Sequence, residues 1–332
     1  MRASDIRAVP LTGSDASSVV ADVWAGRVRA VDVTEQALAR VAEVDARLQA
    51  FTDVWADRAR RAAVVVDARI AAGERPRLAG VPIAVKAWQQ RGDRYVARLI
   101  RAGAVPVGAT SVPVGTTWQT WGLGRGGPTR NPWRADRVPG GSSAGSAAAV
   151  GAGAVPLATG SDGAGSARIP AAWCGVVAVK PSAGLLPTAT GTAEHAPLAT
   201  TIADAALYLD VVTDQQLALH DALTRPTPGP VRAVWAPTLG QPGVRRWLDE
   251  TTVAVAYGAV ASLVRAAVLD VEQAPQGPWL SDPAPAWRAC RADPAAPTSA
   301  VIRRDAAVCW SVPRRRRART VTPGQASTCP WR

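Results

Sequence analysis

Cysteine, histidine and lysine are scarce in this chain of 332 residues. Four cysteines in a chain this long do not make a disulfide-bonded scaffold, and they form no CxxC pair that would suggest a structural zinc site. The two histidines, His195 and His220, are too isolated to predict a Ser-His-Asp site, and we expect them at surface or loop positions.

Lysine occurs only at Lys86 and Lys180, whereas arginine occurs 36 times. A guanidinium group does not lose its proton in proteins, whereas a buried amine can. Each lysine is therefore a candidate for chemistry that arginine cannot perform. The alternative is that a compositional bias has left two lysines by chance.

Long apolar runs are also absent. No segment reaches about 18 apolar residues without a polar interruption, and the N-terminal region shows no signal-peptide pattern. We therefore expect a soluble, cytoplasmic protein that does not bind membranes. Hydrophobic residues make up 48% of the chain, which is enough for a large core and excludes disorder of the whole chain.

Positive charge is concentrated near the C-terminal end. The net charge is +12, and residues 290–332 contribute +7 of it, with nine arginines against Asp293 and Asp305. We predict either a disordered basic tail or the product of a shifted reading frame in GC-rich coding DNA. A non-enzymatic protein that binds nucleic acid through this tail is an alternative, but aromatic residues are barely interleaved with the basic run, so no nucleic-acid partner is expected by default.

The N-terminal part has a helical pattern. Asp32 followed by Glu35 predicts a helix start, and apolar residues recur at helical spacing as far as Leu48. A second helix is expected to begin at Thr52 as its cap and to stop at Gly73. We assign residues 1–75 as a helical lead-in.

Short apolar runs punctuated by glycine and proline follow the lead-in. The runs Val81–Val85, Ala104–Val107 and Val155–Ala158 predict buried strands, and helices are expected over Ser143–Val150 and Ile202–Val212. This alternation predicts a mixed α/β domain.

Three segments carry residues suited to acyl transfer. Lys86 ends GVPIAVK, Ser142 and Ser143 stand in PGGSSAGSAAAV, and Ser166 stands in GSDGAGSARIPAAWCG. The glycines before Ser166 allow successive backbone N–H groups to turn toward a carbonyl oxygen, as an oxyanion hole requires. A Gly-Ser loop alone is more often a plain turn.

Taken together, these segments resemble the amidase signature family. The similarity runs from about Leu78 to Asp210 and includes GPTRNPW at Gly127–Trp133 and the helix ADAALYLD. The resemblance implies an α/β fold with a mixed central β-sheet flanked by helices. It also implies hydrolysis of a carboxylic amide through an acyl-enzyme, without a metal or cofactor.

The resemblance assigns roles to individual residues. Ser166 matches the nucleophile, Ser142 matches the bridging serine in a cis peptide conformation, and Lys86 matches the general base. An amine acts as a base only when burial and positive neighbours lower its pKa, so we expect Lys86 to be neutral. The implied oxyanion hole consists of backbone N–H groups of Gly163, Ala164 and Gly165.

Neighbouring residues have expected supporting roles. Asp162 and Arg168 match family positions at which a buried ion pair would hold the nucleophile loop. Ser143 is expected to cap the following helix, with replacement of Ser142 as the alternative. Lys180 is expected to be structural at a strand end, and Cys174 to be a small buried residue.

The chain departs from the family pattern after Lys86. The family continues with Asp-Asn and a long glycine-rich stretch that lines the substrate pocket, whereas here AWQQRGDRYVARLIRAGAVPVG follows. We therefore expect an open or misshapen pocket that Trp88 could partly fill. Ala164 also replaces a glycine.

We divide the remaining chain into three parts. Residues 76–215 are the expected signature core, residues 216–289 a partial C-terminal half of the same domain, and residues 290–332 the basic tail. The resemblance ends near Cys290, so we expect a chain truncated at its C-terminus.

The predicted function is an amidase that converts a small-molecule amide to an acid and ammonia or an amine. One alternative is the glutaminase (A) subunit of a tRNA-dependent amidotransferase, which would need partner subunits. Another is a catalytically inactive remnant. A homodimer is left open, and the sequence does not identify the substrate.

Overall fold

The computed structural model describes residues 15–89, 92–116, 118–188, 193–214, 217–225, 229–238 and 248–273. The chain divides into two units, Met1–Pro228 and Gly229–Arg332, which are described separately. The predicted basic tail at 290–332 and the end of the partial C-terminal half lie outside the described residues.

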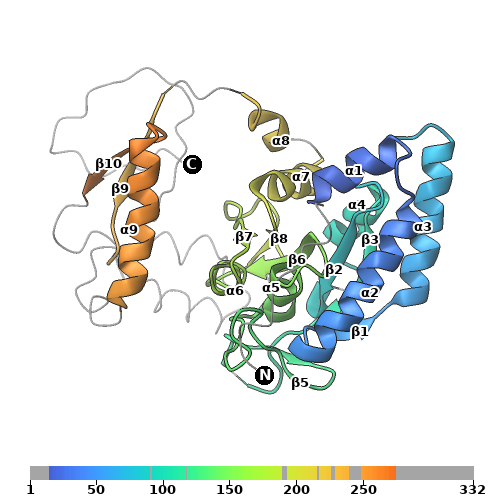
Figure 1. Cartoon of the computed structure of the whole chain (residues 1–332), viewed down its shortest axis with the longest axis horizontal. Coiled ribbons are helices and arrows are strands. Elements are labelled where there is room, and N and C mark those ends of the chain that lie inside the picture. Colours follow the sequence, from blue (N-terminus) through green and yellow to red (C-terminus); the bar gives the residue numbers. More distant parts are fainter. Residues whose placement is uncertain are drawn as a thin grey trace. The chain divides into compact units, whose positions relative to one another are not determined.

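A six-stranded mixed sheet forms the centre of the first unit (Figure 1). Its strands, in chain order, are β1 (Phe51–Val54), β2 (Pro82–Lys86), β3 (Val105–Thr110), β6 (Leu157–Asp162), β7 (Val177–Ala178) and β8 (Glu194–Ala199). They are arranged in the order β1-β3-β2-β6-β8-β7. β2 is parallel to β3 and β6, whereas β1 runs antiparallel to β3, and β8 runs antiparallel to β6 and β7. The predicted α/β class with a mixed central sheet is confirmed.

Helices surround this sheet. They are α1 (Ala16–Trp24), α2 (Ala30–Leu48), α3 (Ala56–Ala71), the 3-10 turn η2 (Ala87–Gln89), α4 (Arg94–Arg101), α5 (Ala144–Gly151), α6 (Arg168–Cys174), α7 (Ile202–Val212) and α8 (Leu219–Ala222). In Figure 1, α1, α4 and α7 lie along one side of the strands and α5 lies on the other. A two-stranded hairpin, β4 (Leu123–Gly124) and β5 (Gly127–Pro128), lies apart from the main sheet.

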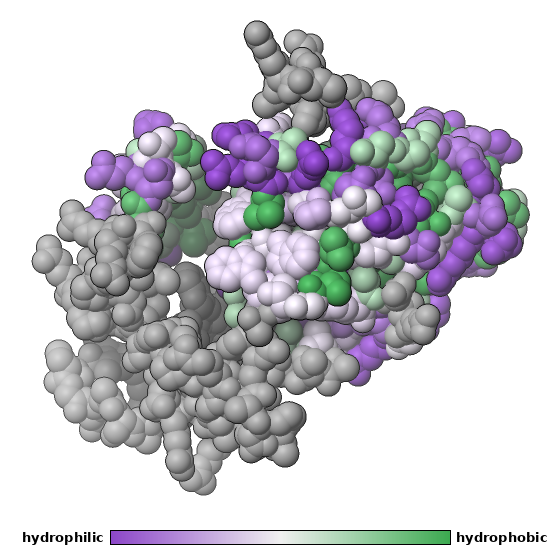
Figure 2. Space-filling view, turned by 90° about the horizontal axis from the view of Figure 1, so that it is seen from below, coloured by the Kyte–Doolittle hydropathy of each residue, from purple (hydrophilic) through white to green (hydrophobic). Residues whose placement is uncertain are grey.

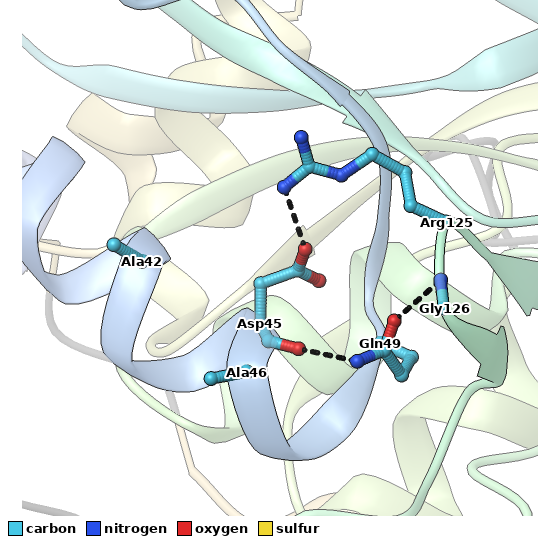
Figure 3. Close-up of a pocket in the computed structure, with 6 residues that line it drawn as sticks. All are labelled: Ala42, Asp45, Ala46, Gln49, Arg125 and Gly126. Carbon is cyan, nitrogen blue, oxygen red and sulfur yellow. Dashed lines mark hydrogen bonds and ion pairs between the residues drawn. The ribbon is translucent and has the colours of Figure 1, made fainter.

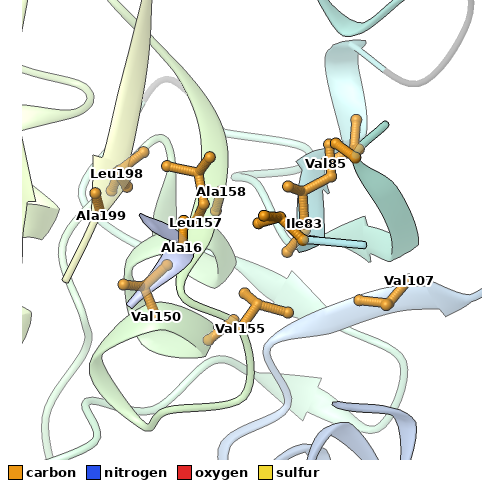
Figure 4. Packing of buried hydrophobic residues seen from close by; sticks show 14 of the residues in the cluster. Ala16, Ile83, Val85, Val107, Val150, Val155, Leu157, Ala158, Leu198 and Ala199 are labelled. Carbon is orange, nitrogen blue, oxygen red and sulfur yellow. The ribbon is translucent and has the colours of Figure 1, made fainter. Parts of the chain in front are cut away.

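The core lies between the sheet and its helices. Every residue of β2, β3 and β8 is buried, because these strands are paired on both edges and covered by helices. Figure 4 shows how Ile83, Leu157 and Leu198 from neighbouring strands pack together. The small residues of α5 allow close approach: a Cβ on Gly145 would collide with the carbonyl of Ala50.

The helix boundaries correct two predictions from the sequence. α2 begins at Ala30, ahead of the predicted start at Asp32, because Asp67 on α3 accepts hydrogen bonds from the N–H groups of Ala30 and Val31. Thr52 does not cap a helix, because it lies in β1, a strand that pairs with β3 and that the sequence did not predict. Gly73, with φ of +86°, follows the end of α3 as expected.

The second unit contains a strand-helix-strand motif. Its elements are β9 (Val231–Trp235), α9 (Glu250–Arg265) and β10 (Leu269–Gln273), and the two strands are parallel. Within residues 229–238 and 248–273, no side chain is buried inside the unit. Across the described parts of both units, no helix is long and apolar enough to cross a membrane.

Candidate active site

Lys86 is the last residue of a buried central strand. Its side chain is 0% exposed, and its backbone N–H donates to Thr159 Oγ1 of β6 at 2.9 Å. An amine in this position has lost its contact with bulk water, so protein groups must satisfy its hydrogen-bonding capacity.

Three serine hydroxyls surround the amine of Lys86. Its Nζ lies 3.0 Å from Ser142 Oγ, 2.9 Å from Ser143 Oγ and 2.9 Å from Ser161 Oγ. A neutral amine has two N–H donors and one lone pair, and hydroxyls both donate and accept, so three hydroxyls can satisfy it completely. Burial lowers the pKa of Lys86 to about 7, against the opposing charge of Asp162.

Ser142 and Ser143 lie directly before helix α5, beside the amine of Lys86. The peptide bond between Gly141 and Ser142 is cis, and a Cβ on Gly141 would collide with backbone atoms of Gln119 and Trp121. Ser143 occupies the N-cap position but makes no capping hydrogen bond, since its hydroxyl contacts Lys86 instead. The prediction that the Ser143 side chain caps α5 is therefore wrong.

Ser166 lies in the loop between β6 and α6. The N–H of Ser143 donates to the carbonyl of Ser166 at 3.0 Å, which brings the two serine segments together. Ser166 is half-buried, and among the described residues no hydrogen bond joins its hydroxyl to Ser142. The backbone contact places the segments side by side and leaves the Ser166 hydroxyl without a protein partner among those residues.

Asp162 organises the loop that carries Ser166. Its buried carboxylate accepts hydrogen bonds from the N–H groups of Gly165 at 2.7 Å, Ala167 at 3.2 Å and Arg168 at 3.1 Å. The guanidinium of Arg168 also forms a two-pronged ion pair with it, at 2.8 and 2.9 Å. Burial alone would raise the pKa of Asp162, but the bonds from Arg168 and the backbone lower it to about 2.

These contacts affect the expected oxyanion hole. The N–H of Gly165 points at Asp162 Oδ1 and is not free to bind an oxyanion. The half-buried Gly163 and the exposed Ala164 are the expected donors that remain.

Two other residues near Lys86 were not assigned roles from the sequence. Thr159 and Ser161 are two positions apart in β6, so their side chains lie on the same face of that strand, toward Lys86. The two-residue spacing of these hydroxyls in β6 is the signal that could have identified them.

Trp88 lies over the amine of Lys86. Its ring centroid is 4.8 Å from Nζ, although the side chain is 57% exposed. Trp88 therefore covers the amine of Lys86 and also presents aromatic surface to solvent.

Figure 2 shows a face of the molecule on which weakly polar and apolar residues adjoin, bordered by strongly hydrophilic ones.

His195 corrects a further prediction from the sequence. It lies in strand β8 and is 3% exposed, so its expected surface or loop position is wrong. Its ring contacts Asp93 and Gln89. His220 is half-buried in α8.

Lys180 and Cys174 lie outside the serine cluster. Lys180 Nζ donates to the carbonyl of Pro181 at 2.6 Å, and burial lowers its pKa. Cys174 is 0% exposed, as expected, and burial raises the pKa of its thiol to about 12.

A surface pocket lies at the C-terminal end of α2 (Figure 3). Gln49 bridges it, accepting from the N–H of Gly126 at 2.7 Å and donating to the carbonyl of Asp45 at 3.1 Å. Arg125 closes it with an ion pair to Asp45 at 3.2 Å. These contacts fasten the β4-β5 hairpin to α2.

Among the described residues, no three histidine, cysteine or acidic side chains gather as metal ligands would.

Comparison with known proteins identifies the family of this chain. A sequence profile of the Amidase family matches residues 32–93 and 89–241. The chain belongs to the amidase family. Its match covers Lys86, Ser142 and Ser166.

Related proteins resemble this chain over much of its length. The A subunit of a glutamyl-tRNA(Gln) amidotransferase from Mycolicibacterium paratuberculosis is 38% identical over 260 residues, which is 70% of this chain and 53% of that protein. The chain spans about half the length of the curated relatives it matches.

Solved amidase structures have a similar fold. Peptide amidase from Stenotrophomonas maltophilia superposes with a TM-score of 0.62 at 27% identity, over 80% of this chain and 62% of that one. A bacterial aryl acylamidase of the amidase signature family gives 0.66 at 26% identity, over 82% and 64%.

Proposed function

We propose that this chain hydrolyses a carboxylic amide to an acid and ammonia or an amine, with Ser166 as nucleophile, Ser142 as bridging serine and Lys86 as base. The observation that carries the proposal is the contact between a fully buried amine with a pKa of about 7 and the hydroxyl of Ser142. At neutral pH a large fraction of such an amine is neutral and can accept a proton.

The reaction begins with proton transfer. The hydroxyl of Ser166 turns toward Ser142 and attacks the amide carbonyl, while its proton passes to Ser142 and the proton of Ser142 passes to Lys86. The new C–O bond converts the carbonyl into a tetrahedral oxyanion. The N–H groups of Gly163 and Ala164, which have no partner among the described residues, are suited to bind that oxyanion.

The relay then runs in reverse. Lys86 returns its proton through Ser142 to the leaving nitrogen, the C–N bond breaks, and ammonia or an amine departs. Water attacks the acyl-enzyme and gives up a proton to the relay, and Ser166 recovers its proton as the acid leaves. Asp162 and Arg168 hold the loop in shape throughout, and no step draws on a metal or cofactor.

Covalent labelling tests this proposal. Purified protein is treated with a serine-reactive fluorophosphonate and analysed by mass spectrometry, alongside Ser166→Ala and Lys86→Met variants. We expect label on Ser166 in the original protein and none there in either variant. Ser143→Ala is the matched control, since Ser143 also contacts Lys86 but has no place in the relay.

A folded protein that takes no label at Ser166 would contradict the proposal and favour an inactive remnant. Ammonia release from a panel of amides then defines the substrate. Labelling without turnover of any amide would leave an activated serine that lacks a working pocket, and would contradict hydrolysis by this chain.

The relative from Mycolicibacterium paratuberculosis supports a second candidate. That protein is named as the A subunit of a glutamyl-tRNA(Gln) amidotransferase. A glutaminase of this kind would release ammonia from glutamine only with its partner proteins and a charged tRNA present. Release from simple amides by the chain alone favours the first proposal.

A further inference from the structure

A buried chain of hydrogen bonds runs past the candidate base. His195 Nε2 lies 3.0 Å from Asp93 Oδ2, and His195 Nδ1 lies 2.8 Å from Gln89 Nε2. The same Gln89 nitrogen donates to the carbonyl of Gly160 at 2.8 Å. The side chains of His195 and Gln89 are 3% and 5% exposed, and the ring of Tyr95 packs on His195 with centroids 4.5 Å apart.

The carbonyl of Gly160 fixes which atom donates and which accepts in each of these hydrogen bonds. A carbonyl only accepts hydrogen bonds, so the Gln89 atom facing it must be the NH2 group. That group also faces His195 Nδ1, which must therefore be the unprotonated, accepting nitrogen. His195 then carries a proton on Nε2 and donates it to Asp93.

The two residues joined by the hydrogen bond from Gln89 to the carbonyl of Gly160 both lie near Lys86. Gln89 follows Lys86 by three residues, at the end of the 3-10 turn η2. Gly160 directly precedes Ser161, whose hydroxyl is 2.9 Å from Lys86 Nζ. The Gln89 bond therefore ties the turn after the base to the strand that supplies one of its hydroxyl contacts.

We infer that three residues, Gln89, His195 and Asp93, position Lys86. By fastening η2 to β6, they hold the buried amine of Lys86 among the three serine hydroxyls that contact it. The polar residues orient the turn but lower the stability of the fold, since Gln89 Oε1 is buried without a hydrogen-bond partner among the described residues. Apolar side chains of similar size would fill the same space without stranding a polar atom. The inference rests on the proposed role of Lys86 as base.

Nuclear magnetic resonance tests the inference without requiring activity. The chain has only two lysines and two histidines, so protein with 13Cε-labelled lysine gives two lysine signals. Lys180→Arg removes one signal and assigns the other. The titration midpoint of Lys86 is then followed in Gln89→Leu, His195→Leu and His195→Gln, with Lys180 as internal reference and His220→Gln as matched control.

Loosening the turn admits water to Lys86 and favours its charged form. We expect the Lys86 midpoint to rise by about half a unit or more in Gln89→Leu and His195→Leu, with Lys180 unmoved. His195→Gln retains one donor and one acceptor and should restore the original midpoint. In 15N-labelled protein, the ring nitrogens of His195 should show a proton on Nε2 and none on Nδ1.

An unchanged Lys86 midpoint in folded Gln89→Leu and His195→Leu would overturn the inference. If His195→Leu does not fold, Gln89→Met keeps the side-chain volume and carries the test. Failure of the proposed function has a different signature: Ser166 then takes no fluorophosphonate label although the Lys86 midpoint still responds to Gln89→Leu. Where both hold, labelling of Gln89→Leu at neutral pH should slow by about twofold, because a rise of half a unit halves the neutral fraction of Lys86.

Discussion

Replacement of Lys86 by methionine should change how the stability of the protein depends on pH. Burial lowers the pKa of Lys86 from 10.5 in the unfolded chain to about 7 in the fold. Between these values the unfolded chain binds one more proton at this site than the folded chain does. The free energy of unfolding therefore rises with pH, by about 1.4 kcal/mol per pH unit from this group alone.

The size of the effect follows from the shift. The stability contributed by a neutral Lys86 is complete above the unfolded pKa and is lost as the pH falls through the folded one. The whole shift corresponds to about 5 kcal/mol, and between about pH 7 and pH 9 the change is about 2 kcal/mol, because the folded-state amine is still half protonated at pH 7. Lys86→Met lacks this dependence, because methionine does not titrate.

Denaturant unfolding at a series of pH values measures it. The difference in unfolding free energy between the original protein and Lys86→Met removes the contributions of all other groups, including Cys174, whose raised pKa destabilises the fold at high pH. Lys180→Met is the matched control and should show a smaller dependence, since Lys180 is only half-buried. Parallel curves for the original protein and Lys86→Met would refute the argument that Lys86 is neutral in the fold.

Three further outcomes are expected. The rate of Ser166 labelling should rise with pH through a midpoint of about 7, because the neutral form of Lys86 is the base; a rate independent of pH between about 6 and 8 would contradict this. Asp162→Asn should lower the unfolding free energy by about 2–3 kcal/mol in denaturation and abolish labelling in mass spectrometry. The reason is that the loop loses a carboxylate that accepts hydrogen bonds from Gly165, Ala167 and Arg168. Unchanged labelling would show that the loop holds its shape without the charge. Gly145→Ala should lower the free energy of unfolding by about 1–3 kcal/mol, because the new Cβ meets the carbonyl of Ala50. Gly258→Ala in α9 has open space around the new Cβ and should not lower it. Equal effects of the two changes in denaturant unfolding would refute the close packing of α5.

The sequence predicts those elements whose signals are local. The helix over Ile202–Val212 is found with the predicted bounds, and the strand over Val81–Val85 differs from β2 by one residue at each end. Continuous apolar runs and helical spacing are properties of neighbouring residues, so no knowledge of the rest of the fold is needed.

Elements that depend on distant partners were missed. β1 is four residues long, and it forms because β3, more than fifty residues later, lies beside it. The buried position of His195 has the same origin, since it depends on the pairing of β8 with β6 at Ser161. The roles predicted for Lys86, Ser142 and Ser166 came from the family resemblance of their motifs. The contacts of Ser143 and Ser161 with Lys86 needed the structure.

The topology of the sheet also governs when the cluster around Lys86 can exist. The hydroxyls that surround the amine come from residues 56 to 75 positions further along the chain, and the last of them, Ser161, belongs to β6, which pairs with β2. Closing such long segments is slow compared with forming local helices. A nascent chain on the ribosome therefore carries an ordinary, charged lysine until β6 has emerged and paired with β2. The uptake of label by Ser166 should accordingly report the late steps of refolding.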